Sequence, residues 1–293
     1  LLTMHHILGD ASSLNILGNE LLTLYQAELH GQSVALPAIP ANYADFVRAE
    51  TALLNSSARE ELVQYWQRQL GKESSILNLP TDYPRPAIQS YRGSSVPFGL
   101  PAQLSQQLKQ LARQEKSTLF SLLLTAFQIL LHRYTGQTEI WIGTPSSISR
   151  RQPQFANLIG YLVNPVVLRA TIDPSLNLSF SELLSQTKST VLTALEHSAY
   201  PFPLLVKTLQ PQRDLSYAPL FQVMLDFQPA GSLPLIPSVT GLTVALFEMA
   251  QMEGQFDLLL EIGEGEQLRG RLKYNSDLFR PATIERMLSH FQT

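Results

Sequence analysis

Two adjacent histidines, His5 and His6, stand near the start of the chain, and an aspartate, Asp10, follows four residues after the second. Imidazole changes its protonation near neutral pH, so either histidine could act as a general acid or base, and the carboxylate could fix the loop that carries it. This division of labour suits acyl transfer. A His-His dipeptide is more often a buried pair bonded to backbone carbonyls, so the residues alone leave both interpretations open.

Metal binding is another use of clustered histidines. We expect the motif to lie at the end of a strand, where His5 and His6 would face opposite sides and could not share one ion. The sequence has no other His, Asp or Glu cluster at ligand spacing, and it contains no cysteine. We therefore expect no metal site.

The composition limits the classes of function. The chain has 293 residues, 44% of them hydrophobic and 15% charged, which is enough to bury a large core. A formal net charge of -3 offers no basic surface for a phosphate backbone, so we expect no nucleic-acid partner. The most apolar run, residues 119–131, is too short to cross about 30 Å of hydrocarbon, so we expect no membrane span. The lack of cysteine agrees with a reducing compartment, and we expect a cytoplasmic protein.

Local elements must position the motif. We expect residues 1–6 to end a strand, and the hydroxyl residues after the motif to cap a helix with apolar residues at helical spacing from Leu14 to Tyr25. Residues 43–70 are predicted to be mostly helical. Three prolines exclude a helix from residues 79–86, which makes that segment the expected crossover between two lobes.

Helix and strand patterns alternate in the rest of the chain. Helices are expected after Pro101, over residues 119–131 with Ser117 as the cap, over residues 179–197, and after Pro281. Strands are expected at residues 92–98, 139–143, 163–172, 221–227, 242–247, 256–262 and 268–274. The mixture predicts an α/β sandwich, and periodicity carries the fold no further.

Longer motifs are more specific than the dipeptide. Residues 5–11 (HHILGDA) resemble the HHxxxDG signature of nonribosomal peptide synthetase condensation domains, within the chloramphenicol-acetyltransferase-like superfamily. Residues 43–46 (YADF) resemble the start of that family's YxDYAxWQ motif, residues 159–164 (IGYLVN) its IGxFVNT motif, and residues 200–202 (YPF) the end of HQDxPFE. The most specific match is residues 213–222 (RDLSYAPLFQ), similar to RDxSRNPLFQ, which argues against an epimerisation domain.

The resemblance implies a two-lobe α/β sandwich of the chloramphenicol-acetyltransferase type, with a tunnel that phosphopantetheine arms enter from both faces. Residues 1–80 would be the C-terminal part of the N-terminal lobe, and residues 81–293 the C-terminal lobe. We thus expect an N-terminally truncated fragment with much of the first lobe missing, apolar surface exposed and no activity of its own.

The implied activity is amide-bond formation between carrier-bound substrates. The implied partners are upstream and downstream peptidyl carrier domains and an adjacent adenylation domain of the same synthetase. No cofactor would bind directly, because the phosphopantetheine arms of the carriers deliver the substrates.

The resemblance also assigns roles to residues. His6 matches the catalytic histidine, which would position or deprotonate the acceptor amine or stabilise charge in the tetrahedral intermediate. His5 and Asp10 match mainly structural positions, with Asp10 bonded to an arginine upstream of this chain. Ser13 and the amide of Ala11 would line the substrate site.

Asn164 would lie on a strand beside the tunnel, where a functional role and a structural hydrogen-bonding role are equally expected. The sequence also departs from the family pattern, because Ala11 replaces the motif glycine and Ser12 a common tryptophan. If position 11 needed a positive φ, alanine would be strained by about 1 kcal/mol or more. These departures leave open a related epimerisation or ester-forming domain, or a catalytically weak carrier-recruiting domain.

Overall fold

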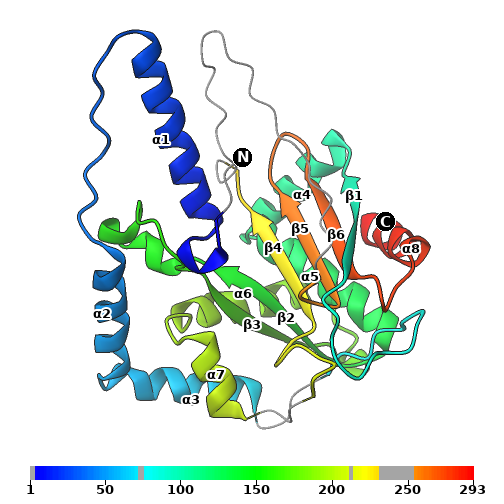
Figure 1. Cartoon of the computed structure of the whole chain (residues 1–293). Coiled ribbons are helices and arrows are strands. Elements are labelled where there is room, and N and C mark those ends of the chain that lie inside the picture. Colours follow the sequence, from blue (N-terminus) through cyan, green and yellow to red (C-terminus); the bar gives the residue numbers. More distant parts are fainter. Residues whose placement is uncertain (1–3, 72–75, 211–213, 231–253) are drawn as a thin grey trace.

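A six-stranded mixed sheet forms the centre of the molecule, with strand order β1-β6-β5-β4-β2-β3 (Figure 1). The computed structural model describes residues 4–71, 76–210, 214–230 and 254–293. The strands are β1 (Gly93–Gly99), β2 (Glu139–Ser146), β3 (Asn164–Thr171), β4 (Val223–Gln228), β5 (Leu258–Gly263) and β6 (Arg269–Asn275). Each overlaps a predicted strand, so those six predictions are confirmed. The seventh, residues 242–247, lies outside the described residues.

The sheet is mixed, with parallel pairs on both sides of β4 and antiparallel pairs toward both edges. β4 pairs in parallel with β2 and β5, and the β2–β3, β5–β6 and β1–β6 pairs are antiparallel. Gly143 of β2 lies beside Met224 of β4, and a Cβ atom on Gly143 would stand 2.1 Å from the ring of Phe221. Glycine at this position therefore lets an aromatic ring lie directly on the strand.

The helices that pack against the sheet or against each other include α4 (Ala102–Gln114), α5 (Leu119–Thr135), α6 (Phe180–Glu196) and α8 (Pro281–Gln292). α5 is the predicted apolar helix, and its side chains are mostly buried. Its cap is Thr118, whose hydroxyl accepts the Ser121 N–H at 3.1 Å, so the prediction of Ser117 as the cap was wrong by one residue. Gly136 ends the helix in a left-handed conformation.

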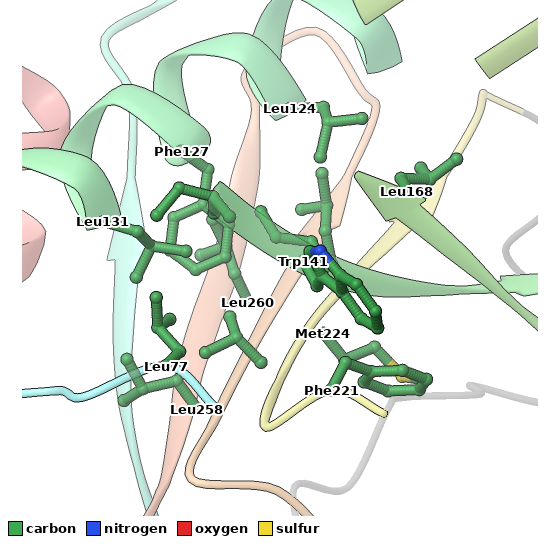
Figure 2. Packing of buried hydrophobic residues seen from close by; sticks show 14 of the residues in the cluster. Leu77, Leu124, Phe127, Leu131, Trp141, Leu168, Phe221, Met224, Leu258 and Leu260 are labelled. Atoms are coloured by element: carbon green, nitrogen blue, oxygen red, sulfur yellow. The ribbon is translucent and has the colours of Figure 1, made fainter. Parts of the chain in front are cut away.

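The core lies between α5 and the sheet. Figure 2 shows Phe127 and Leu131 directed from α5 toward Leu258 and Leu260 of β5. All four side chains are at most 1% exposed. Full burial of such side chains stabilises a fold by about 1.5–3 kcal/mol each, which makes this layer the main source of stability.

The first part of the chain contains η1 (His6–Leu8), α1 (Ala11–Leu29), α2 (Tyr43–Leu54) and α3 (Ala58–Leu70). The predicted strand before the motif is wrong for the described residues, because His6–Leu8 form a 3-10 helix that the His5 side chain caps. The predicted helical stretch 43–70 is confirmed, with a break between α2 and α3.

α1 and α3 differ in how they meet the rest of the molecule. α1 extends away from the sheet (Figure 1), and its Leu14 and Leu21 are 50% and 65% exposed, which is the expected exposure of apolar surface. α3 instead buries Trp66 and Leu70 in the sheet's core, and the Trp66 indole N–H donates to the His197 carbonyl at 3.1 Å. In the described part of the chain, no helix is long and apolar enough to cross a membrane.

Candidate active site

His6 lies on the exposed turn that precedes α1. Its Nδ1 atom is 2.9 Å from the carbonyl oxygen of Gly9. A carbonyl oxygen only accepts hydrogen bonds, so Nδ1 carries the proton and Nε2 of the neutral ring keeps its lone pair. Among the described residues, Nε2 has no hydrogen-bond partner, so a basic nitrogen is open to an incoming group.

His5 has the opposite tautomer. The backbone N–H of Ile7 donates to His5 Nδ1 at 3.2 Å, so this nitrogen is unprotonated and the neutral ring carries its proton on Nε2. His5 is thereby engaged as the cap of η1. Of the two histidines, His6 is the one whose free nitrogen can take a proton.

Asp10 caps α1 and is almost completely buried. Its Oδ1 accepts from the Ser13 N–H at 2.9 Å, the Ser13 hydroxyl at 3.0 Å and Arg150 Nη2 at 2.7 Å, while Oδ2 accepts from the Leu162 N–H at 3.2 Å. Burial raises the pKa of this carboxyl, but the bonds from Arg150, Ser13 and Leu162 outweigh burial and hold its pKa below the ordinary value. Asp10 is therefore ionised at neutral pH.

The arginine partner of Asp10 was predicted to lie upstream of this chain, and that prediction was wrong. The partner is Arg150, 140 residues downstream, on the short helix η2 (Ile148–Arg151) between β2 and β3. The loop after β2 returns to the motif, so two distant segments of the same chain supply the ion pair.

Arg150 bonds both to the motif and α1 and to the loop before β3. Its Nη1 donates to the Leu158 carbonyl at 2.7 Å, and its Nη2 also reaches the Ser13 hydroxyl at 3.1 Å and the Gly160 carbonyl at 3.3 Å. The Ser13 oxygen in turn accepts the Gly160 N–H at 3.1 Å. We call Asp10, Ser13, Arg150, Gly160 and Leu162 the clasp, because these residues tie the motif to the loop before β3.

Side chains pack closely against two glycines at the clasp and the motif. A Cβ atom on Gly160 would lie 2.4 Å from the ring of Tyr43, and the Tyr43 hydroxyl donates to the Tyr161 carbonyl at 3.2 Å. On the motif side, a Cβ atom on Gly9 would lie 2.6 Å from the terminal carbon of Met4. A side chain at either position would force its neighbours to shift, because the Tyr43 ring at Gly160 and the Ser13 Cβ atom, 2.9 Å away at Gly9, occupy the space of a methyl group.

Ala11 is not strained, because the positive φ that would have strained an alanine here is not present. It is the first residue of α1, directly after the Asp10 cap, and does not have a positive φ. Alanine fits this helical position well. The Ser13 hydroxyl, which was expected to line the substrate site, is fully buried inside the clasp.

Asn164 is the first residue of β3, and its amide is fully used. Nδ2 donates to the carbonyls of Ser198 at 2.8 Å and Tyr200 at 2.9 Å, and Oδ1 accepts the Phe202 N–H at 2.8 Å. These bonds attach the turn between α6 and α7 (Phe202–Leu209) to the sheet. Of the two roles left open by the sequence, the structure contains the hydrogen-bonding one.

Tyr161 is a site residue that the sequence did not single out. Its ring meets the His6 imidazole edge to face, with 5.2 Å between ring centroids. Burial and the charge of Asp10 raise the pKa of the Tyr161 hydroxyl, which stays protonated at neutral pH. Arg150 was also missed, because it lies 140 residues from Asp10 in the chain and no spacing pattern in the sequence links the two.

No metal centre accompanies these residues in the part of the chain that the structure describes, where no three His, Cys, Asp or Glu side chains gather as ligands. The arrangement instead offers an exposed base on a turn that a buried ion pair holds in place. Proton transfer at a reacting group is the chemistry that it supports.

The amino-acid sequence of the chain is similar to that of known proteins. The Condensation domain family model matches residues 1–293. Gramicidin S synthase 2 of Brevibacillus brevis is 37% identical, over 99% of this chain and 6% of that protein. Phosphinothricin tripeptide synthetase PhsC of Streptomyces viridochromogenes is 35% identical, over 98% of this chain and 26% of that protein. The chain thus spans a small part of these curated relatives.

Solved structures agree with the fold. A four-domain nonribosomal peptide synthetase bound to AMP and glycine superposes with a TM-score of 0.85 at 28% identity, over 99% of this chain and 22% of that one. The X-domain from teicoplanin biosynthesis gives a TM-score of 0.87 at 23% identity, over 99% of this chain and 67% of that one, which is a likeness of fold. The predicted chloramphenicol-acetyltransferase-like α/β fold is confirmed.

Proposed function

The chain belongs to the condensation-domain family, and from this premise we propose that it forms amide bonds between carrier-bound substrates. The amine of an acceptor aminoacyl thioester attacks the carbonyl carbon of a donor acyl or peptidyl thioester. The new C–N bond forms as the C–S bond breaks, and the proton lost by the amine ends on the departing thiolate. The peptidyl or acyl chain is thereby transferred to the acceptor carrier.

The free Nε2 atom of His6 is the observation that carries this proposal. Nε2 accepts the proton of the attacking amine, and the Gly9 carbonyl at Nδ1 stabilises the imidazolium that results. The same nitrogen then returns the proton to the sulfur leaving group. Positioned proton transfer of this kind contributes about 10²–10⁴-fold to a rate.

The clasp keeps His6 in place during this step. Asp10 holds the first turn of α1 while Arg150 fixes the carboxylate from the opposite segment. We assign His5 and Asp10 supporting roles for this reason. That the amide of Ala11 lines the substrate site stays a prediction, as does a division into lobes near residue 80.

The proposed substrates arrive on phosphopantetheine arms of peptidyl carrier domains upstream and downstream. An adenylation domain of the same synthetase would load the acceptor. Likeness to a four-domain synthetase and to a much longer gramicidin S synthase supports these partners. The absence of cysteine supports a cytoplasmic location.

A catalytically weak recruiting domain was one of the alternatives, and the alanine at position 11 was one reason for it. Ala11 lies in helical backbone at the start of α1, so that reason no longer applies. An Ala11→Gly variant should therefore gain little activity, within about two-fold, since glycine only lowers helix propensity there.

The deciding experiment measures amide product by mass spectrometry with loaded donor and acceptor carriers. The variants are made in the natural polypeptide that contains this sequence. His6→Ala should lower the rate by about 10²–10⁴-fold, and His30→Ala, at the exposed far end of α1, is the matched control and should match wild type. Equal rates for wild type and His6→Ala would remove the general-base role. No product from any loaded pair, even with Ala11→Gly, would favour the recruiting domain.

A further inference from the structure

We propose that Tyr161 is a positioning residue for His6, whose ring holds the imidazole in the orientation that leaves Nε2 open. Only the kinetic consequence of this inference rests on the proposed function. The contact itself is a property of the folded chain.

Two restraints act on the imidazole. The bond from Nδ1 to the Gly9 carbonyl comes from the motif turn itself. The Tyr161 ring comes from the segment before β3 and meets the imidazole at 75° between ring planes. One hydrogen bond leaves an exposed ring free to exchange rotamers, whereas an aromatic contact from a second segment restricts that exchange.

The backbone that carries Tyr161 is anchored on both sides. Gly160 bonds to Ser13 and Arg150, the Tyr161 carbonyl accepts from Tyr43, and the Leu162 N–H donates to Asp10. These bonds fix the position of the Tyr161 Cα atom relative to α1. The same clasp that holds the His6 turn therefore places the Tyr161 ring beside it.

Core packing does not account for the Tyr161 side chain. Three other apolar residues of the segment, Phe155, Leu158 and Leu162, are each 3–4% exposed and pack with Phe46 in a small cluster. Tyr161 lies between them in the chain but is 38% exposed and faces His6. The motif IGxFVNT leaves this position unspecified, so the family resemblance assigns it no role.

The direct test is the tautomer of His6 in the 293-residue chain, read from imidazole ¹⁵N shifts in long-range ¹H–¹⁵N NMR spectra. Loss of the signals in His6→Gln assigns them. Wild type should have the single tautomer with the proton on Nδ1. Tyr161→Ala should move both nitrogen shifts toward the averaged values of a free imidazole, and Tyr161→Phe, which keeps the ring, should restore the wild-type shifts.

Two controls separate positioning from structure. Tyr25→Ala removes a tyrosine of similar exposure, 42%, from α1 and should leave the His6 shifts unchanged. Tyr161→Leu keeps apolar bulk without the aromatic ring, and it should shift His6 while the Ser13 and Leu162 amides keep their wild-type positions. If Tyr161→Ala leaves His6 unchanged, or if Tyr161→Leu also displaces those clasp amides, the positioning role is overturned.

A kinetic readout follows from the proposed function. Tyr161→Ala should lower kcat on the order of five-fold with KM unchanged, and Tyr161→Phe should stay within about two-fold of wild type. Absence of any product from the wild-type protein would refute the proposed function. The NMR test of Tyr161 would be unaffected, because it measures the His6 tautomer and not the activity.

Discussion

Two regions of the molecule are stabilised by different forces: the sheet with α5, and the motif of residues 5–11 with α1. The sheet and α5 bury apolar side chains such as Phe127 and Leu260 almost completely. α1 leaves Leu21 and its neighbours exposed, and the motif at its start meets the sheet region through the polar clasp. Buried area therefore sets the stability of the molecule, while a few directional bonds set the geometry around His6.

The largest expected effect is the loss of a core ring. Phe127→Ala should lower the free energy of unfolding by about 3–5 kcal/mol, because a buried aromatic ring leaves a cavity behind. Leu21→Ala, on the exposed face of α1, should change it by no more than about 0.5 kcal/mol. Urea unfolding followed by circular dichroism measures both variants. Similar losses would mean that α1 shares the core of the sheet, against the contrast drawn above.

Removing the arginine of the clasp comes next. Arg150→Ala leaves the Asp10 carboxylate buried without its cation, which should cost about 2–3 kcal/mol. The loss should be local, so amide hydrogen exchange should speed up at Ser13 and Leu162 while the amides of α5 keep their protection. Arg151→Ala is the matched control from the same helix. Uniform loss of protection along the chain would place the clasp within the global folding unit.

Replacing the uncharged Asn164 should lower the stability less than replacing Arg150. Asn164→Ala removes an amide that satisfies two carbonyls and one N–H at the turn before α7, and should destabilise the protein by about 1–2 kcal/mol. Thermal unfolding measures this loss. Because these bonds account for the whole amide, the amide product rate per folded molecule should stay near that of wild type. A large rate loss without a stability loss would restore a functional role for Asn164.

The smallest effect concerns Asp226, whose pKa shift is opposite in direction to that of Asp10. Burial and the nearby Glu261 raise the pKa of Asp226 on β4 against the opposing effects of Gln228 and Lys273, whereas bonds lower that of Asp10. Because the pKa of Asp226 is raised in the folded protein, the ionised carboxylate lowers the free energy of unfolding once the pH exceeds the ordinary pKa of an aspartate. Asp226→Asn should therefore stabilise the chain at pH 7, by about 0.5 kcal/mol.

The pH dependence should therefore differ in sign between the two regions. Asp226→Asn should lose its advantage at about pH 3, where the wild-type carboxyl is protonated as well. Asp10→Asn should be less stable than wild type at pH 7, and this difference should shrink as the pH falls through the lowered pKa of Asp10. Thermal melts across this pH range measure the stability change of both variants. Stability changes of the same sign at pH 7 would contradict the opposite pKa shifts of Asp226 and Asp10.

Much of the fold follows from local pattern. Alternating and β-branched runs predicted the six described strands to within a few residues, and the apolar run 119–131 predicted α5. Errors arose where a single side-chain bond decides the outcome. Thr118 rather than Ser117 caps α5, and His5 caps a 3-10 helix that begins at His6, where the end of a strand was expected.

The sequence by itself determined the family and the α/β pattern, because these depend on residue types at short spacing, and the family motif is the source of the prediction that His6 is catalytic. Only the tertiary structure decided that Arg150 pairs with Asp10, that Asn164 is fully hydrogen-bonded and that Tyr161 meets His6. The reason is physical. A buried polar group bonds to whatever partner the fold brings within about 3 Å, and here those partners lie tens of residues away or more along the chain.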